Sequence, residues 1–302
     1  MGQQQRRIAV IGDVHDQWSA ADGEALMQLG VDLALFVGDF GNEAVEIVAA
    51  IAALPLPKAV ILGNHDAWYS ATEWGRKKCP YNRTVEDRVA QQLEILGPAH
   101  VGYGRLEFPD LGLTVVGGRP FSWGGAEWRN RHFYCDRYGV NTLAESAERI
   151  CQAVQAAQHS TLIFVGHCGP TGLGDTPESP CGKDWNPIGG DFGEPDLAAG
   201  IALAQQSGKA VPLVTFGHMH HRLRHRQDIL RQRLAQDAQG TVHLNAACVP
   251  RVYPGPPSTH HFSLVSLDAN QVQQVEQLWV TPTGLIRQRE TLYCQAPVTL
   301  SS

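Results

Sequence analysis

Apolar residues in this chain occur in short runs, and each of five such runs is followed by a glycine and then by Asp, Asn or His. The runs lie at residues 8–11, 33–37, 59–62, 162–165 and 211–216 and are rich in Val, Ile, Leu and Phe. Short apolar runs bounded by turn residues are typical of buried strands. The sequence therefore predicts five buried strands, each with polar side chains close behind its last residue.

Helical patterns alternate with these strands. Residues 19–29 predict a helix with Ser19 as N-cap, and residues 43–54 predict a second helix that prolines end. Further helices are predicted at residues 84–96, with Thr84 as N-cap, at 142–157 and at 196–206, and a short strand is predicted at 113–116. Alternation of strands and helices predicts an α/β fold.

The pattern changes at about residue 241. Residues 241–244, 262–267 and 275–280 predict strands without long helices between them, which favours antiparallel pairing. The polar residues 286–302 are expected to form a C-terminal tail or an edge strand. Because the polar clusters that would share one site run from residue 13 to residue 220, we expect residues 1–285 to form a single domain.

Two long segments lack a regular pattern. Residues 117–139 are rich in aromatic residues and arginines, whereas residues 169–195 are rich in Gly and Pro. Long loops in compact domains tend to be functional. The first segment either packs over a sheet or forms a recognition wall, in which Arg129 and Arg131 bind a second phosphate or carboxylate and an aromatic ring stacks on a base or sugar. For the second segment, a mobile lid is the hypothesis.

Composition and charge restrict the partners. The chain has 302 residues and a formal net charge of −6, which argues against nucleic-acid binding through an overall basic surface. Its seven cysteines include no C-x-x-C pair, and we find neither a signal-peptide pattern nor an apolar run that would span a bilayer. We therefore expect a cytoplasmic protein with reduced thiols and no membrane partner, and the oligomeric state stays open.

The predicted strand ends carry oxygen and imidazole donors that suit a pair of divalent metal ions. The donors are Asp13, His15, Asp39, Asn64, His167, His218 and His220. We expect them to converge, because ligands collect at the carboxyl ends of strands in α/β folds. Nitrogen and oxygen donors without thiolates suit Mn, Fe or Zn, and the donor type does not choose between these metals.

The charges of this donor set favour phosphate chemistry. Asp39 has two carboxylate oxygens and can bridge two ions. Two divalent ions, two aspartates and one bridging hydroxide leave a net charge of about +1, which attracts a phosphate anion. Two ions roughly 3.5–4 Å apart lower the pKa of a bridging water and bind both oxygens of an in-line displacement at phosphorus. The expected reaction is hydrolysis of a phosphate ester.

The ordered motifs Asp-x-His, Gly-Asp, Gly-Asn-His-Asp, Gly-His and Gly-His-x-His resemble the calcineurin-like metallophosphoesterase superfamily over residues 8 to about 222. The resemblance implies a four-layer αββα sandwich with mixed sheets and a two-metal site at its rim. The implied ligands are Asp13, His15 and His220 for one ion, Asn64, His167 and His218 for the other, and Asp39 as the bridge. The resemblance also implies that His65 faces the substrate and protonates the leaving oxygen, with Asp66 behind the ligands.

We expect a phosphoesterase for a small phosphorylated substrate, in which a metal-bridging hydroxide attacks phosphorus and His65 is the general acid. The sequence departs from the family pattern beside the ligands, with Asp16 after His15 and Asn42 shortly after Asp39, so the substrate class stays open. One alternative is a phosphodiesterase that acts on cyclic nucleotides or nucleotide-linked pyrophosphates. Another is a scaffold of the same fold without catalysis, and a third is a nuclease, which the acidic balance disfavours.

Overall fold

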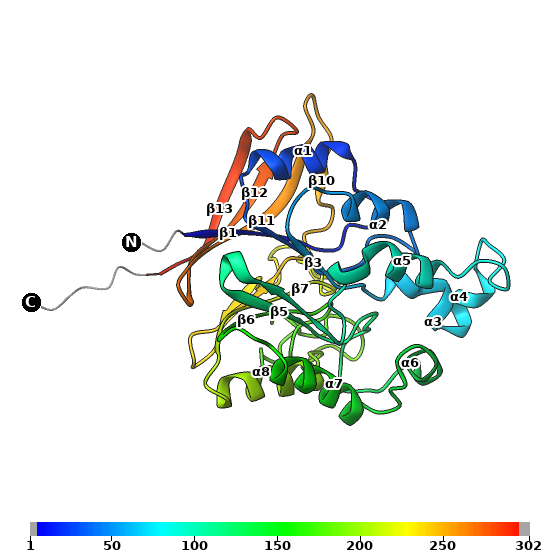
Figure 1. Ribbon diagram of the computed structural model, residues 1–302. Helices are drawn as coiled ribbons and strands as arrows, with labels where there is room; N and C mark the ends of the chain where they lie inside the picture. The colour runs from blue at the N-terminus through cyan, green and yellow to red at the C-terminus, as the bar shows by residue number, and fades with distance from the viewer. Residues whose placement is uncertain (1–4, 296–302) are drawn as a thin grey trace, which may run out of the picture.

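Two mixed β-sheets lie face to face in residues 5–295, the part of the chain that this computed structural model describes (Figure 1). The first sheet has the order β13 (Ile286–Cys294), β12 (Gln271–Val280), β11 (Thr259–Asp268), β1 (Arg6–Ile11), β2 (Leu33–Phe36) and β3 (Lys58–Val60), and β10 (Val252–Tyr253) pairs with β11. The second sheet has the order β4 (Arg105–Phe108), β5 (Leu113–Gly117), β6 (Thr161–Val165), β7 (Ala210–Phe216), β9 (Val242–Asn245) and β8 (Leu234–Gln236).

Helices cover the outer face of each sheet (Figure 1). The first sheet is covered by α1 (Ala20–Gln28), α2 (Val45–Ala52) and α5 (Arg88–Leu96), and the second by α7 (Leu143–Gln155) and α8 (Pro195–Gln206). The shorter elements are α3 (Trp68–Ala71), α4 (Glu73–Lys77), α6 (Arg131–Tyr138) and the 3-10 turns η1 (His65–Ala67), η2 (Gly97–Ala99) and η3 (Pro109–Leu111). The predicted four-layer αββα sandwich is confirmed.

The apolar runs supply two layers of core at once. Ile8 and Val10 of β1 pack between the sheets, whereas Ala9 and Ile11 pack toward the helices. Successive side chains of a strand point to opposite faces, so a strand that is buried on both faces must be apolar at every position. This explains why the five predicted strands are continuous apolar runs, and all five are present in the structure.

Strand direction brings the polar clusters to one edge. β1, β2 and β3 run parallel to one another, and so do β5, β6, β7 and β9. Parallel strands end on the same side of a sheet, where α/β folds bind their ligands. The segments that follow β1, β2, β3, β6 and β7 therefore meet at one rim of the sandwich.

Several expectations need correction. α5 begins later than predicted, because Asp87 rather than Thr84 accepts the capping hydrogen bond, from Ala90 N at 2.9 Å. Antiparallel pairing was expected for residues 241–244, yet β9 pairs parallel to β7 and antiparallel only to the short β8. The side-chain period is the same in both arrangements, so the pattern could not distinguish them. Within the segment 117–139, residues 131–138 form the helix α6, which the sequence pattern did not predict.

The end of the described chain extends the first sheet. β13 pairs antiparallel with β12 and is its edge strand, while the expectation for residues 296–302 lies outside the described residues. Among residues 5–295, no helix is both long and apolar enough to span a bilayer.

Candidate metal centre

The seven predicted donors lie together at the rim, in two groups. In the first group, Asp13, His15 and His220 each place a donor atom within 4.8 Å of the others. His15 Nε2 lies 3.1 Å from His220 Nε2, and His220 Nε2 lies 3.4 Å from Asp13 Oδ1. Three nitrogen and oxygen donors from two distant parts of the chain thus converge on one point, a geometry that fits a metal ion.

The second group surrounds the amide oxygen of Asn64. His167 Nε2 lies 3.0 Å and His218 Nδ1 lies 2.9 Å from Asn64 Oδ1. Asp39 joins the two groups, because its Oδ1 is 3.3 Å from His167 Nε2 and its Oδ2 is 3.9 Å from His15 Nε2. A carboxylate that faces both donor groups with different oxygens has the position that bridging requires.

Backbone strain is concentrated in these donors. Asp13, His15, Asp39 and His218 all have left-handed backbone, with φ of 49°, 44°, 57° and 66°. Residues other than glycine rarely adopt this conformation, and each instance costs about 1–3 kcal/mol unless the surroundings enforce it. Hydrogen bonds enforce this conformation here, because His15 N donates to Asp39 O at 2.8 Å and His218 N donates to the Asp13 carboxylate at 3.1 Å. Strain of this kind is typical of functional sites.

Glycine permits the donor loops to approach one another. A Cβ on Gly38 would lie 2.6 Å from Gly63 N, and a Cβ on Gly63 would lie 2.4 Å from Asp39 Oδ1. Asp66 then ties the same loops together, because its buried carboxylate accepts from Gly63 N (2.6 Å), Asp39 N (3.0 Å) and Phe40 N (2.9 Å). Asp66 thus fixes the backbone on both sides of Asp39, and it is not one of the side chains whose donor atoms converge on a candidate metal position.

Charge at the site favours a cation. Burial disfavours the charged form of His167, but Asp39 and Asp13 more than offset this effect and raise its pKa to about 10. Burial likewise opposes ionisation of Asp39, yet the neighbouring histidines hold its pKa well below the usual value. Burial and the charge of His167 lower the pKa of His218 to about 3, so His218 is already neutral, whereas His167 must release its proton before it can bind a metal ion. The two aspartates therefore create a site that attracts positive charge.

His65 lies beside the donors, in an orientation fixed from three sides. Its Nδ1 is 2.6 Å from Asn42 Oδ1, its backbone N donates to Asp39 Oδ1 at 2.9 Å, and its ring stacks on Trp68 at 4.4 Å between centroids. Its Nε2 is 4.0 Å from Asp39 Oδ2. Burial lowers the pKa of His65, and the charge of Asp39 opposes that shift. No sequence motif indicates a role for Asn42, whose contact depends on how the loop after Asp39 folds back.

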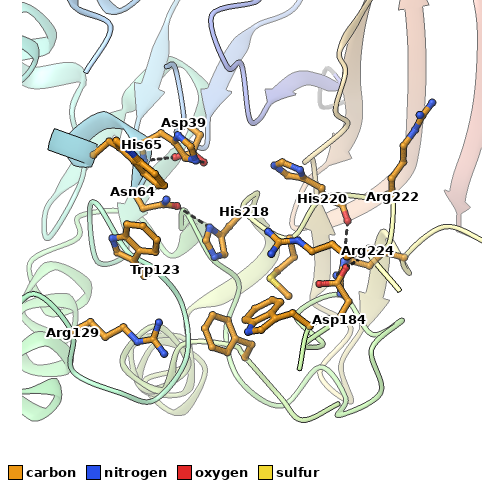
Figure 2. Close-up of a pocket in the computed structure, with 15 residues that line it drawn as sticks. Asp39, Asn64, His65, Trp123, Arg129, Asp184, His218, His220, Arg222 and Arg224 are labelled. Atoms are coloured by element: carbon orange, nitrogen blue, oxygen red, sulfur yellow. Dashed lines mark hydrogen bonds and ion pairs between the residues drawn. The ribbon is translucent and has the colours of Figure 1, made fainter. Parts of the chain in front are cut away.

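The donors open into a pocket of about 410 Å³ (Figure 2). Beyond the donors and His65, its wall consists mainly of aromatic rings and arginines, which we call the outer pocket. The outer pocket is lined by Trp68, Trp123, Arg129, Asp184, Trp185, Phe192, Met219, Arg222, Arg224 and Arg231. Of the two arginines predicted for substrate binding, Arg129 lines the pocket, whereas Arg131 does not and lies exposed at the start of α6.

Segment 169–195 is fastened to the body of the protein rather than loosely attached. The buried Arg231 guanidinium donates to the carbonyl oxygens of Pro177, Ser179 and Gly182 at 2.7–2.9 Å and pairs with Asp184 at 3.2 Å. These bonds satisfy backbone groups that would otherwise be orphaned in a loop without secondary structure. They favour a fixed wall of the pocket over the mobile lid that the Gly and Pro content suggested.

Comparison with known proteins agrees with the fold. Solved structures of the same fold include TT1561 of Thermus thermophilus, with 12% identity, a TM-score of 0.50 and coverage of 96% of this chain and 100% of that one. PhoD is similar at 8% identity and a TM-score of 0.50, over 96% of this chain and 69% of the other. None of the curated proteins matches the chain. The family model for calcineurin-like phosphoesterases matches residues 6–222, and the chain belongs to this family.

Proposed function

We propose that the protein hydrolyses phosphate esters of small substrates with two divalent metal ions, which we expect to be Mn, Fe or Zn. Asp13, His15 and His220 would hold one ion, and Asn64, His167 and His218 the other. The single observation that carries this proposal is that Asp39 presents one oxygen to each donor group. When bound, such a pair of ions supplies Lewis acidity toward phosphoryl oxygens and a hydroxide nucleophile at neutral pH.

His65 is the proposed general acid. The Asn42 amide oxygen accepts from Nδ1–H, so Nε2 carries a proton only when the imidazole is protonated at both nitrogens. That Nε2 proton is then directed toward the donors and is transferred to the leaving alkoxide oxygen. Trp68 covers one face of the ring, which limits its rotation and its contact with water.

A phosphodiesterase is the second candidate, because the pocket continues past the donors into the aromatic and basic outer pocket. The larger group of a diester has room there. A scaffold without catalysis is less well supported, since every predicted donor is present and all seven converge.

Metal analysis with a substrate panel tests the proposal. The purified chain is loaded with Mn²⁺ or with Fe²⁺ and Zn²⁺, its metal content is measured, and turnover is compared on p-nitrophenyl phosphate, bis-p-nitrophenyl phosphate and cyclic nucleotides. We expect two ions per chain and hydrolysis of p-nitrophenyl phosphate, whereas preference for the bis ester or a cyclic nucleotide would favour the diesterase. A chain that binds no metal and turns over none of these compounds would be a scaffold.

A further inference from the structure

The pocket formed by the donors and the outer pocket together is larger than a phosphate group alone requires, since its volume of about 410 Å³ falls within the range of sites for drug-sized ligands. We infer that it binds a leaving group with both a planar aromatic ring and a second negative charge, the combination found in a nucleotide. This inference rests on the proposed function, because it assumes that the reacting phosphate lies at the metal donors.

Aromatic rings line the outer pocket on two sides. Trp68 is stacked between His65 and Trp123, with a centroid distance of 5.3 Å to Trp123, so Trp123 ends the stack. Elsewhere in the wall, Trp185 packs edge-on against Phe192 at 4.8 Å. Trp123 and Trp185 are only half-buried, which leaves ring surface for a substrate. Every nucleobase has a π-face that stacks on such rings.

Arg224 supplies the charge for a second anion. Its guanidinium lies over the Trp185 ring at 5.4 Å, and among residues 5–295 its side chain takes part in none of the ion pairs. The nearby Asp184 carboxylate does not neutralise it fully, because Asp184 pairs with Arg231 at 3.2 Å and accepts the Arg224 backbone N–H at 2.9 Å. A guanidinium held on an aromatic ring beside a pocket is suited to bind phosphate or carboxylate.

The arrangement places these groups around the reacting position. Figure 2 shows Trp123 and Arg129 on one side of the pocket and Arg224 with Asp184 on the other, with His218 between them. Arg129 already pairs with Glu127 at 2.8 Å, so Arg224 rather than Arg129 is expected to bind the second anion. A leaving group that extends from the donors thus meets an aromatic ring and an unpaired guanidinium.

Four substrates separate the two features of the leaving group. Ribose 5-phosphate has neither a ring nor a second charge in its leaving group, p-nitrophenyl phosphate and AMP have a ring, and ADP has both. For the Mn²⁺-loaded full chain we expect kcat/KM to be highest for ADP. Arg224→Gln should lower kcat/KM for ADP about 10- to 100-fold, mainly through KM, and change that for p-nitrophenyl phosphate by less than about twofold. Arg226→Gln, an exposed residue outside the pocket, is the charge-matched control and should change neither.

The ring is tested in the same panel. Trp185→Leu should lower kcat/KM for ADP and AMP about fivefold or more and leave ribose 5-phosphate unaffected. Equal losses for ADP and p-nitrophenyl phosphate in Arg224→Gln would overturn the inference, and so would ribose 5-phosphate turned over as efficiently as ADP. Either result, with p-nitrophenyl phosphate still hydrolysed, leaves the proposed function intact.

A binding measurement decides the case in which no substrate is hydrolysed and the proposed function itself fails. The wild-type chain and Arg224→Gln are titrated calorimetrically with α,β-methylene-ADP. Binding by wild type that weakens about tenfold or more in the variant supports the subsite. Lack of binding by wild type, or equal binding by both chains, overturns it.

Discussion

His65 Nδ1 lies 2.6 Å from Asn42 Oδ1, so a neutral amide rather than a carboxylate orients the imidazole beside the metal donors. The amide oxygen orients the ring by accepting a hydrogen bond from Nδ1–H, but it carries no negative charge that would stabilise the protonated ring. Burial then lowers the pKa of His65. The protein therefore separates positioning of this ring from electrostatic stabilisation of its charge, and both functions can be tested.

Asn42→Asp should extend activity to higher pH. The general acid is active below the pKa of His65, and a carboxylate at 2.6 Å would raise that pKa by about one unit or more. The decrease of kcat with rising pH, measured with an alkyl phosphate, should shift upward by the same amount. Asn82→Asp, an exposed position with the same change in charge, should leave the profile unchanged. An unshifted profile in Asn42→Asp would show that His65 does not supply the proton.

Removal of His65 should affect substrates according to their leaving groups. In His65→Ala, hydrolysis of β-glycerophosphate should fall about 10²–10⁴-fold, because an alkoxide needs protonation to leave. Hydrolysis of p-nitrophenyl phosphate should fall much less, since p-nitrophenolate leaves without a proton. Metal content, measured in the same samples, should not change. Equal losses for both substrates together with loss of metal would instead make His65 a ligand.

Arg119 should be essential for stability although it lies outside the metal centre. Its buried guanidinium is 3.2 Å from Glu194 and 3.4 Å from Asp196, and it connects the two long segments that line the pocket. Arg119→Met leaves two buried carboxylates without their cation and should destabilise the fold by about 3–5 kcal/mol in urea unfolding. The exposed pair of Arg129 and Glu127 is the matched control, and Arg129→Met should cost less than about 1 kcal/mol. Similar losses of unfolding free energy in both variants would contradict a stabilising role for Arg119.

Asp22 should make stability depend on pH in the acid range. Burial opposes its ionisation, but His260 and Arg251 more than offset that effect and lower its pKa to about 2. The unfolded carboxyl has a pKa of about 3.9, so the folded chain binds this proton less readily. The stabilisation, about 2 kcal/mol, is complete above about pH 4 and is lost as pH falls toward 2.

Urea unfolding of wild type and Asp22→Asn at pH 6 and pH 3 measures this contribution. Asn at position 22 cannot ionise, so the variant should lose less stability between the two pH values than wild type does. Asp110→Asn, at an exposed position, is the control and should follow wild type. Identical losses of stability in wild type and Asp22→Asn would show that ionisation of Asp22 does not control stability in acid.

The convergence of the candidate metal donors could be predicted because they follow strands directly. Asp13 comes two residues after the end of β1 and Asp39 three residues after the end of β2, and parallel strands must end at one edge. Their presence at this edge therefore follows from the strands. The alternation of strands and helices was predicted from the pattern in the same way, whereas the four-layer sandwich was implied by the family resemblance.

Residues placed by long-range contacts could not be predicted in this way. Asn42 reaches His65 only because the loop after Asp39 reverses, and the left-handed backbone of Glu43 within it has no sequence signal of its own. Arg231 looks like a surface residue in the sequence, yet it is buried because three carbonyl oxygens and Asp184 satisfy its guanidinium. Arg224 depends on Trp185, which lies some forty residues earlier in a loop without a regular pattern.

Anomalous X-ray diffraction from crystals of the Mn²⁺-loaded chain tests the central claim most directly. We predict two metal peaks roughly 3.5–4 Å apart, one on each side of the Asp39 carboxylate, and the loss of at least one peak in Asp39→Asn. A single peak that Asp39 does not contact, or no peak at these donors in wild type, would contradict the account.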